Sequence, residues 1–137
     1  NEEAFALASG SDGAWLDAGN PDDLERAVDG ARKRIPEHGT SLHRAFAVVS
    51  QLPSPPDNII LLTDGLPTMG TKKPWRKKIS NKQRMQFFIE ATQKLPKRIP
   101  INVILYPMEG DPLAAPLYWR LAVNSRGSFF CPSQDWP

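Results

Sequence analysis

Two short polar segments carry the residues best suited to chemistry in this sequence. Residues 39–42 (Gly-Thr-Ser-Leu) offer hydroxyl groups, and residues 63–65 (Thr-Asp-Gly) offer a carboxylate directly after an apolar run. Hard cations such as Mg²⁺ take hydroxyl, carboxylate and water oxygens and keep several waters. A carboxylate at the end of a buried strand also needs a partner, because an isolated buried charge is costly. Thr40 and Asp64 supply one hydroxyl and one carboxylate, which are ligand types that such a cation accepts.

Other chemistries fit the same residues less well. Thr40 precedes an expected helix, so its hydroxyl is also suited to capping that helix. Ser41 and His43 lie close in sequence, but no third residue completes a hydrolase triad. A haloacid-dehalogenase-type phosphatase needs an aspartate two positions before Asp64, where Leu62 stands. No glycine-rich phosphate-binding motif occurs either. No nucleophile–base arrangement is therefore visible in the sequence, and we do not expect an enzyme.

The elements that position these segments follow from apolar spacing and turn signals. Residues 58–63 are apolar almost throughout, which is typical of a strand covered on both faces in a parallel sheet. Residues 101–106 form a second such strand, and residues 128–131 a last short one. Helices alternate with the strands; their apolar positions are expected over 24–31, 42–52, 85–95 and 117–122. Residues 80–83 (Ser-Asn-Lys-Gln) have the form of a capping box.

This alternation predicts an open α/β sheet with right-handed crossovers, in which ligands bind at the carboxyl ends of the strands. Both polar segments fall at that edge. Nearer the start of the chain, residues 5–9 and 14–17 have the pattern of two short strands, and residues 10–13 (Gly-Ser-Asp-Gly) provide a turn, so we expect a hairpin. Trp119 and Phe129 are expected to pack inside.

Composition is that of one ordinary globular domain. The chain has 137 residues, of which 40% are apolar, and no apolar run approaches the ~18 residues of a membrane span. The net charge is +2, but residues 1–29 hold eight acids and one base, whereas residues 70–98 hold ten bases and one acid. Five of these bases surround Trp75 in residues 72–78. A solvated loop explains that run better than nucleic-acid binding does. The single cysteine, Cys131, excludes an internal disulfide.

The order and spacing of these motifs give the chain a family resemblance. Residues 39–42, one helix, and then the apolar strand ending in Thr63-Asp64-Gly65 resemble the second half of a von Willebrand factor A (VWA) domain. The closing residues 127–130 (Gly-Ser-Phe-Phe) also resemble the last strand of that family. The resemblance implies a Rossmann-like fold with a metal-ion-dependent adhesion site. Thr40 and Asp64 stand at two of the metal-binding positions of that site.

One departure from the family pattern is large. The family's first strand ends in Asp-x-Ser-x-Ser, which supplies an acid and two hydroxyls to the metal. Residues 7–11 (Leu-Ala-Ser-Gly-Ser) have both serines, but Leu7 stands in the place of the aspartate, and the spacing to Thr40 is too short. A degenerate form of the motif is one alternative. We favour the other, in which residues 5–9 are the family's second strand and residues 1–137 form a partial VWA domain.

Several expectations follow from that interpretation. The family's sheet order is 3-2-1-4-5-6, so a chain that lacks the central first strand should have the hairpin at one edge and an open flank beside residues 58–63. Such a fragment should be poorly soluble or partly unfolded. It should also bind Mg²⁺ or Mn²⁺ weakly or not at all, because two oxygen ligands leave most of the coordination shell to water.

The resemblance implies a metal-ion-dependent protein-interaction module that binds an acidic residue of a protein partner. The alternative is a metal-dependent enzyme or a chelatase-type subunit that carries such a domain. We expect no nucleic-acid partner, membrane association only through regions outside this chain, and a place at the cell envelope or cell surface. The expected rim of the site comprises Ser41, Gly65, Lys72 and Lys73.

Overall fold

The fold is a small α/β arrangement of three strands and four helices. A computed structural model describes residues 4, 6–8, 14–35, 39–72, 74, 75, 78–106 and 108–132. The elements are, in chain order, α1 (Pro21–Arg32), α2 (Leu42–Ser50), β1 (Ile59–Thr63), α3 (Asn81–Thr92), β2 (Ile101–Leu105), α4 (Ala114–Ser125) and β3 (Phe129–Phe130). None of these helices is long and apolar enough to cross a membrane.

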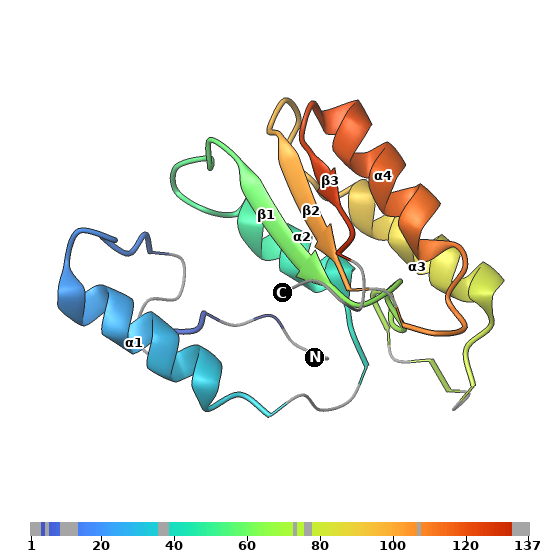
Figure 1. Ribbon diagram of the computed structural model, residues 1–137, viewed down its shortest axis with the longest axis horizontal. Coiled ribbons are helices and arrows are strands. Elements are labelled where there is room, and N and C mark those ends of the chain that lie inside the picture. The colour runs from blue at the N-terminus through green and yellow to red at the C-terminus, as the bar shows by residue number, and fades with distance from the viewer. Residues whose placement is uncertain are drawn as a thin grey trace.

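The three strands form one open parallel sheet in the order β1-β2-β3 (Figure 1). Ile59 pairs with Ile101 at the start of β1, and Thr63 pairs with Leu105 at its end, so β1 and β2 are in register over their whole length. β3 extends the sheet by pairing with Val103 and Ile104. The expected open, parallel α/β sheet is therefore confirmed for these strands.

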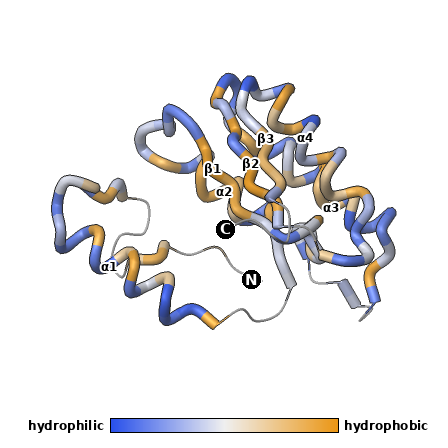
Figure 2. The backbone as a smooth tube through the Cα atoms, viewed as in Figure 1, coloured by the Kyte–Doolittle hydropathy of each residue, from blue (hydrophilic) through white to orange (hydrophobic). Residues whose placement is uncertain are grey.

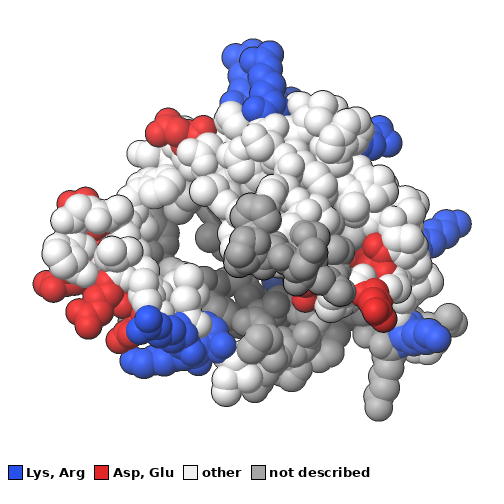
Figure 3. All heavy atoms as spheres, viewed as in Figure 1, with Lys and Arg blue, Asp and Glu red and all other residues white. Residues whose placement is uncertain are grey.

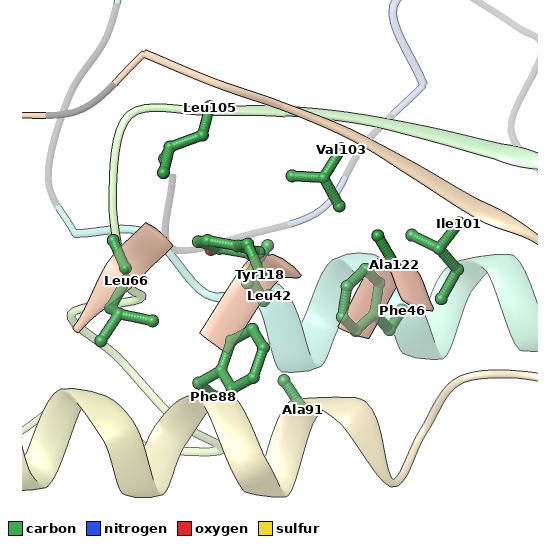
Figure 4. Close-up of a cluster of buried hydrophobic side chains, with 11 residues drawn as sticks. Leu42, Phe46, Leu66, Phe88, Ala91, Ile101, Val103, Leu105, Tyr118 and Ala122 are labelled. Carbon is green, nitrogen blue, oxygen red and sulfur yellow. The ribbon is translucent and has the colours of Figure 1, made fainter. Parts of the chain in front are cut away.

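Helices α2, α3 and α4 all cover the same face of the sheet. Ile101, Val103 and Leu105 point from β2 toward the side chains of these helices (Figure 4). Tyr118 of α4 lies at the centre of this layer and is completely buried. Its ring meets that of Phe88 edge to face, with the centroids 5.0 Å apart. This one-sided layer is the core of the molecule, which also includes Leu42, Phe46, Leu66, Ala91, Ala114 and Ala122.

The opposite face of the sheet is open. Ile60 and Leu62 of β1 are 63% and 62% exposed, and Phe130 of β3 is 43% exposed. The strand register places Leu62, Ile104 and Phe130 in one row across that face. Figure 2 shows how apolar these strands are, although β1 is half-buried only at alternate residues. The expectation of a strand covered on both faces is thus wrong for β1: an apolar run does not reveal that only one helical layer is present.

The expected N-terminal hairpin is also not formed by the described residues. Residues 4, 6–8 and 14–17 contain no strand; residues 5 and 9–13 lie outside the description. Residues 14–17 instead lead into α1, where the Asp17 N–H donates to the Asp23 carboxylate (3.0 Å). A two-stranded hairpin is marginal by itself, and no strand of the described sheet pairs with these residues.

Helix α1 stands apart from the sheet (Figure 1). Asn20 caps it by accepting the Asp22 N–H (3.0 Å). The helix packs against the chain near Leu7, where Gly30 lies so close that a Cβ atom would be 2.0 Å from the Leu7 carbonyl oxygen. Leu24 remains 55% exposed. Its amphipathic sequence therefore forms the expected helix without bringing it to the core.

Candidate functional site

The Thr40 and Asp64 segments lie on two loops that are hydrogen-bonded to each other. The Thr40 N–H donates to Thr68 Oγ1 (2.9 Å). The Thr40 carbonyl accepts from the N–H groups of Thr68 and Met69, both at 3.1 Å. Thr68 and Met69 follow Asp64 by four and five residues, so the segment after β1 folds back onto the Thr40 loop. Thr40 and Asp64 are themselves exposed.

Gly39 is required where these two loops meet. A Cβ atom at this position would be 2.7 Å from Thr68 Oγ1 and 2.7 Å from both Cγ and Sδ of Met69. Real Cβ atoms do not approach other atoms so closely, so a larger residue would displace the Met69 side chain or separate the loops. The glycine before Thr40 therefore has a packing role in joining the two segments.

Ser41 caps helix α2, and Thr40 does not. Ser41 Oγ accepts the Arg44 N–H (3.4 Å) and donates to the Gly70 carbonyl (3.1 Å). Ser41 is 5% exposed, so its hydroxyl serves the backbone of the two loops. The capping role that we considered for Thr40 thus falls to its neighbour. This leaves the Thr40 hydroxyl outside the helix cap.

Arg84 and Asp111, which the sequence analysis did not single out, hold the segment after Asp64. Asp111 Oδ2 accepts the Leu66 N–H (2.7 Å) and lies 2.8 Å from Arg84 Nη2. Arg84 Nε and Nη2 donate to the Leu66 carbonyl at 3.2 and 2.6 Å. Both polar groups of the Leu66 backbone are therefore bound by one buried ion pair, whose side chains are 12% and 1% exposed. We call these residues the Leu66 clamp.

Gly65 completes the close packing around the clamp. A Cβ atom on Gly65 would be 2.7 Å from Asp111 Oδ2 and 3.1 Å from Arg84 Nη2. The Gly65 carbonyl accepts the Tyr118 hydroxyl (2.9 Å) and the Thr63 hydroxyl (3.0 Å). Burial, above all, raises the pKa of Tyr118. Its hydroxyl therefore stays protonated and remains a donor to the loop.

The electrostatic environment of the Asp64 loop is balanced. The Arg84 guanidinium lies near the loop, but its charge is neutralised by Asp111. Asp64 is thus the exposed acid between β1 and the clamp. Within the described residues there is no group of three or more His, Cys, Asp or Glu side chains that could hold a metal ion. A metal site built from the described side chains here would use Asp64 together with hydroxyl or water oxygens.

The other expected rim residues are placed only in part. Gly65 is buried within the segment that follows β1, and Lys72, seven residues later, is exposed. Lys73 lies outside the described residues, as do Arg76 and Lys77 of the basic segment. Trp75 is 88% exposed. The basic segment therefore begins and ends with solvent-exposed lysines, Lys72 and Lys78.

Comparisons of the chain with family models, with curated proteins and with solved structures find no match.

Proposed function

We propose that this chain is part of a VWA-type, metal-assisted protein-interaction domain, with Thr40 and Asp64 on its binding edge. One observation carries the proposal. Thr40 is bonded through both its N–H and its carbonyl to the loop that begins at Asp64. These bonds hold the Thr40 segment against the loop that follows β1, and they support a shared site at the carboxyl edge of the parallel sheet, where open α/β sheets bind ligands.

The donor set suits a hard cation. A hydroxyl and a carboxylate are ligand types that Mg²⁺ and Mn²⁺ accept, and Mg²⁺ characteristically keeps several waters. A bound cation would supply an open coordination position for a carboxylate of a protein partner. Thr40 and Asp64 would orient that cation, and the Leu66 clamp would keep the Asp64 loop from relaxing away from it. Two protein ligands predict weak binding by these residues alone.

Manganese-induced broadening of amide NMR signals tests this proposal, because a paramagnetic ion reveals weak sites by proximity. With Mn²⁺ well below the protein concentration, signals of residues 39–41 and 63–66 should broaden first. Asp64→Asn should remove that broadening, and Thr40→Val should reduce it. Asp57→Asn, which removes an exposed acid elsewhere, is the matched control. Broadening centred on the acids at the start of α1, unchanged in Asp64→Asn, would contradict the proposal.

A second measurement distinguishes the proposed interaction module from the alternative, a metal-dependent enzyme. The chain should not release p-nitrophenol from p-nitrophenyl phosphate with Mg²⁺ or Mn²⁺ present. Steady release above the blank that disappears in Asp64→Asn would assign the same site to phosphoester hydrolysis instead.

A further inference from the structure

A second surface lies at the opposite end of the sheet, where the strands begin. There a groove of about 760 Å³ runs between the end of α3, the segment that enters β2 and the end of α4. Among the described residues, its lining includes three cationic side chains and no acidic one. Figure 3 shows basic side chains projecting at the top of the view, the end at which β2 begins in Figure 1. The cationic residues are Lys97, Arg98 and Arg126.

Both arginines of the groove have an unusual backbone conformation. Arg98 has φ 68° and Arg126 has φ 64°; they are the two non-glycine residues with positive φ in the described part of the chain. This left-handed region is unfavourable for an L-residue and is readily adopted by glycine. Arg126 ends α4 at a position where glycine is the usual residue in proteins. Two arginines thus occupy the positions in the groove where glycine would be less strained.

Helix capping does not account for this arrangement. Cations are favourable near a helix C-terminus, but the effect falls off within the last turn. This reason can apply to Arg126, which directly follows α4. It does not apply to Arg98, which lies six residues beyond the end of α3 at Thr92. None of the ion pairs within the described residues engages either arginine, so their charges are available to a ligand.

The groove also has an apolar floor. Ile101 is buried, and Leu95 and Leu121 are half-buried beside it; the prolines at 96 and 100 add rigid apolar wall. No aromatic residue lines the groove, which removes the stacking surface that single-stranded nucleic acids use. The groove is open rather than enclosed, and so suits a chain that lies along it. The apolar floor and the cationic rim are together complementary to a peptide that carries both leucine-like and acidic side chains.

We propose that this groove binds an acidic, leucine-containing peptide segment of a partner protein. Lys97, Arg98 and Arg126 pair with its carboxylates, while the floor of Leu95, Ile101 and Leu121 takes its apolar side chains. The surface is separate from the Thr40 and Asp64 loops and requires no metal. Chelation of divalent ions therefore leaves binding here unchanged, which distinguishes the two surfaces experimentally.

The test uses a fluorescein-labelled peptide, Asp-Leu-Glu-Leu-Asp-Leu-Glu, and fluorescence anisotropy at low salt with EDTA. The double variant Arg98→Gly/Arg126→Gly removes two rim charges and relieves two strained backbone positions. Its affinity should fall about tenfold, which corresponds to about 1.4 kcal/mol, because two rim ion pairs are lost. Its unfolding temperature should not fall. Arg120→Gln, which removes an exposed charge of α4 outside the groove, is the matched control.

Each outcome decides the proposal. Tenfold weaker binding by the double variant, with unchanged binding by Arg120→Gln, supports it. The double variant removes two charges and Arg120→Gln removes one, so a control whose loss per removed charge equals that of the double variant would show that only net charge is sensed, and would overturn the proposal. So would the absence of binding by the unaltered chain, or equal binding of a control peptide with lysine in place of every acid.

Discussion

The guanidinium of Arg84 and the carboxylate of Asp111 bind the two polar backbone groups of one residue, Leu66. Their ion pair measures 2.8 Å, and Leu66 donates its N–H to Asp111 and offers its carbonyl to Arg84. Arg84 comes from α3 and Asp111 from the segment before α4. The loop that follows Asp64 is therefore anchored to two of the three helices that cover the sheet.

Breaking this pair should be among the most destabilising polar changes in the molecule. In Asp111→Asn, the amide oxygen can still accept the Leu66 N–H, but the Arg84 charge is left nearly buried without a counter-charge. We expect a loss of about 3 kcal/mol in the free energy of unfolding, measured by urea denaturation. Asp57→Asn, on the exposed surface, should change it by less than about 0.5 kcal/mol. In a double-mutant cycle with Arg84→Gln, additive effects of the two changes would show that the pair is not coupled.

Tyr118 should make the protein sensitive to alkaline pH. Burial raises its pKa in the folded state above the ordinary value of 10.0. The unfolded chain therefore loses the phenolic proton first, so this contribution to stability is complete below pH ~10 and is lost progressively above it. Tyr118→Phe should cost about 1 kcal/mol at pH 7, through the lost hydrogen bond to Gly65. It should also flatten the fall in urea midpoint between pH 9 and 11. Tyr106→Phe, at a 54% exposed tyrosine, should leave that pH profile unchanged.

The sequence predicted the elements better than it predicted how they are covered. Apolar runs and caps locate β1, β2 and the helices, and Ser80 forms the expected capping box with Gln83. Trp119, expected inside, is 54% exposed, whereas its neighbour Tyr118 is completely buried. A shift of one residue turns a helical position by about a quarter of a turn, so spacing alone did not fix the buried face. The open side of β1 was missed because an apolar strand sequence does not indicate whether helices cover the second face of the sheet.

The candidate site was predicted in part for a similar reason. Two glycine-containing polar segments located the Thr40 and Asp64 loops: residues 39–42 precede a helix, and residues 63–65 directly follow an apolar strand. Arg84 and Asp111 belong to separate segments, 27 positions apart, and neither stands in a motif. Only the tertiary structure brings them to Leu66. The glycine at position 65 was the local sign of this packing, because Asp111 and Arg84 lie so close to it that a side chain would not fit.

The open face of the sheet should promote self-association. Leu62 is 62% exposed in a row with Ile104 and Phe130, on the edge strand of the described sheet. Exposed apolar edge strands are sites of aggregation. Leu62→Lys should reduce concentration-dependent association in sedimentation velocity, while changing the free energy of unfolding by about 0.5 kcal/mol or less. Leu105→Ala, on the covered face, should instead cost about 2–5 kcal/mol. Unchanged association of Leu62→Lys would mean that this face does not mediate it.

The join between the two loops gives the sharpest test of how the candidate metal site is built. Gly39→Ala places a methyl group where Met69 and Thr68 now lie at 2.7 Å. These neighbours are side-chain atoms, so Met69 can move aside at a cost of about 1–3 kcal/mol. The hydrogen bond from Thr40 to Thr68 should weaken as the loops separate. We therefore expect Mn²⁺ broadening at residues 39–41 and 63–66 to decrease although Thr40 and Asp64 are both retained.

The paired variant Gly39→Ala/Met69→Ala removes the larger of the two obstructing side chains and leaves Thr68 in place, so it should restore part of the broadening that Gly39→Ala loses, even though its stability falls further. If the Mn²⁺ broadening recovers while the free energy of unfolding does not, the loss in Gly39→Ala is due to the spacing of the loops and not to general destabilisation. If broadening instead followed stability through both variants, the spacing of Thr40 and Asp64 would have no specific role in binding the ion.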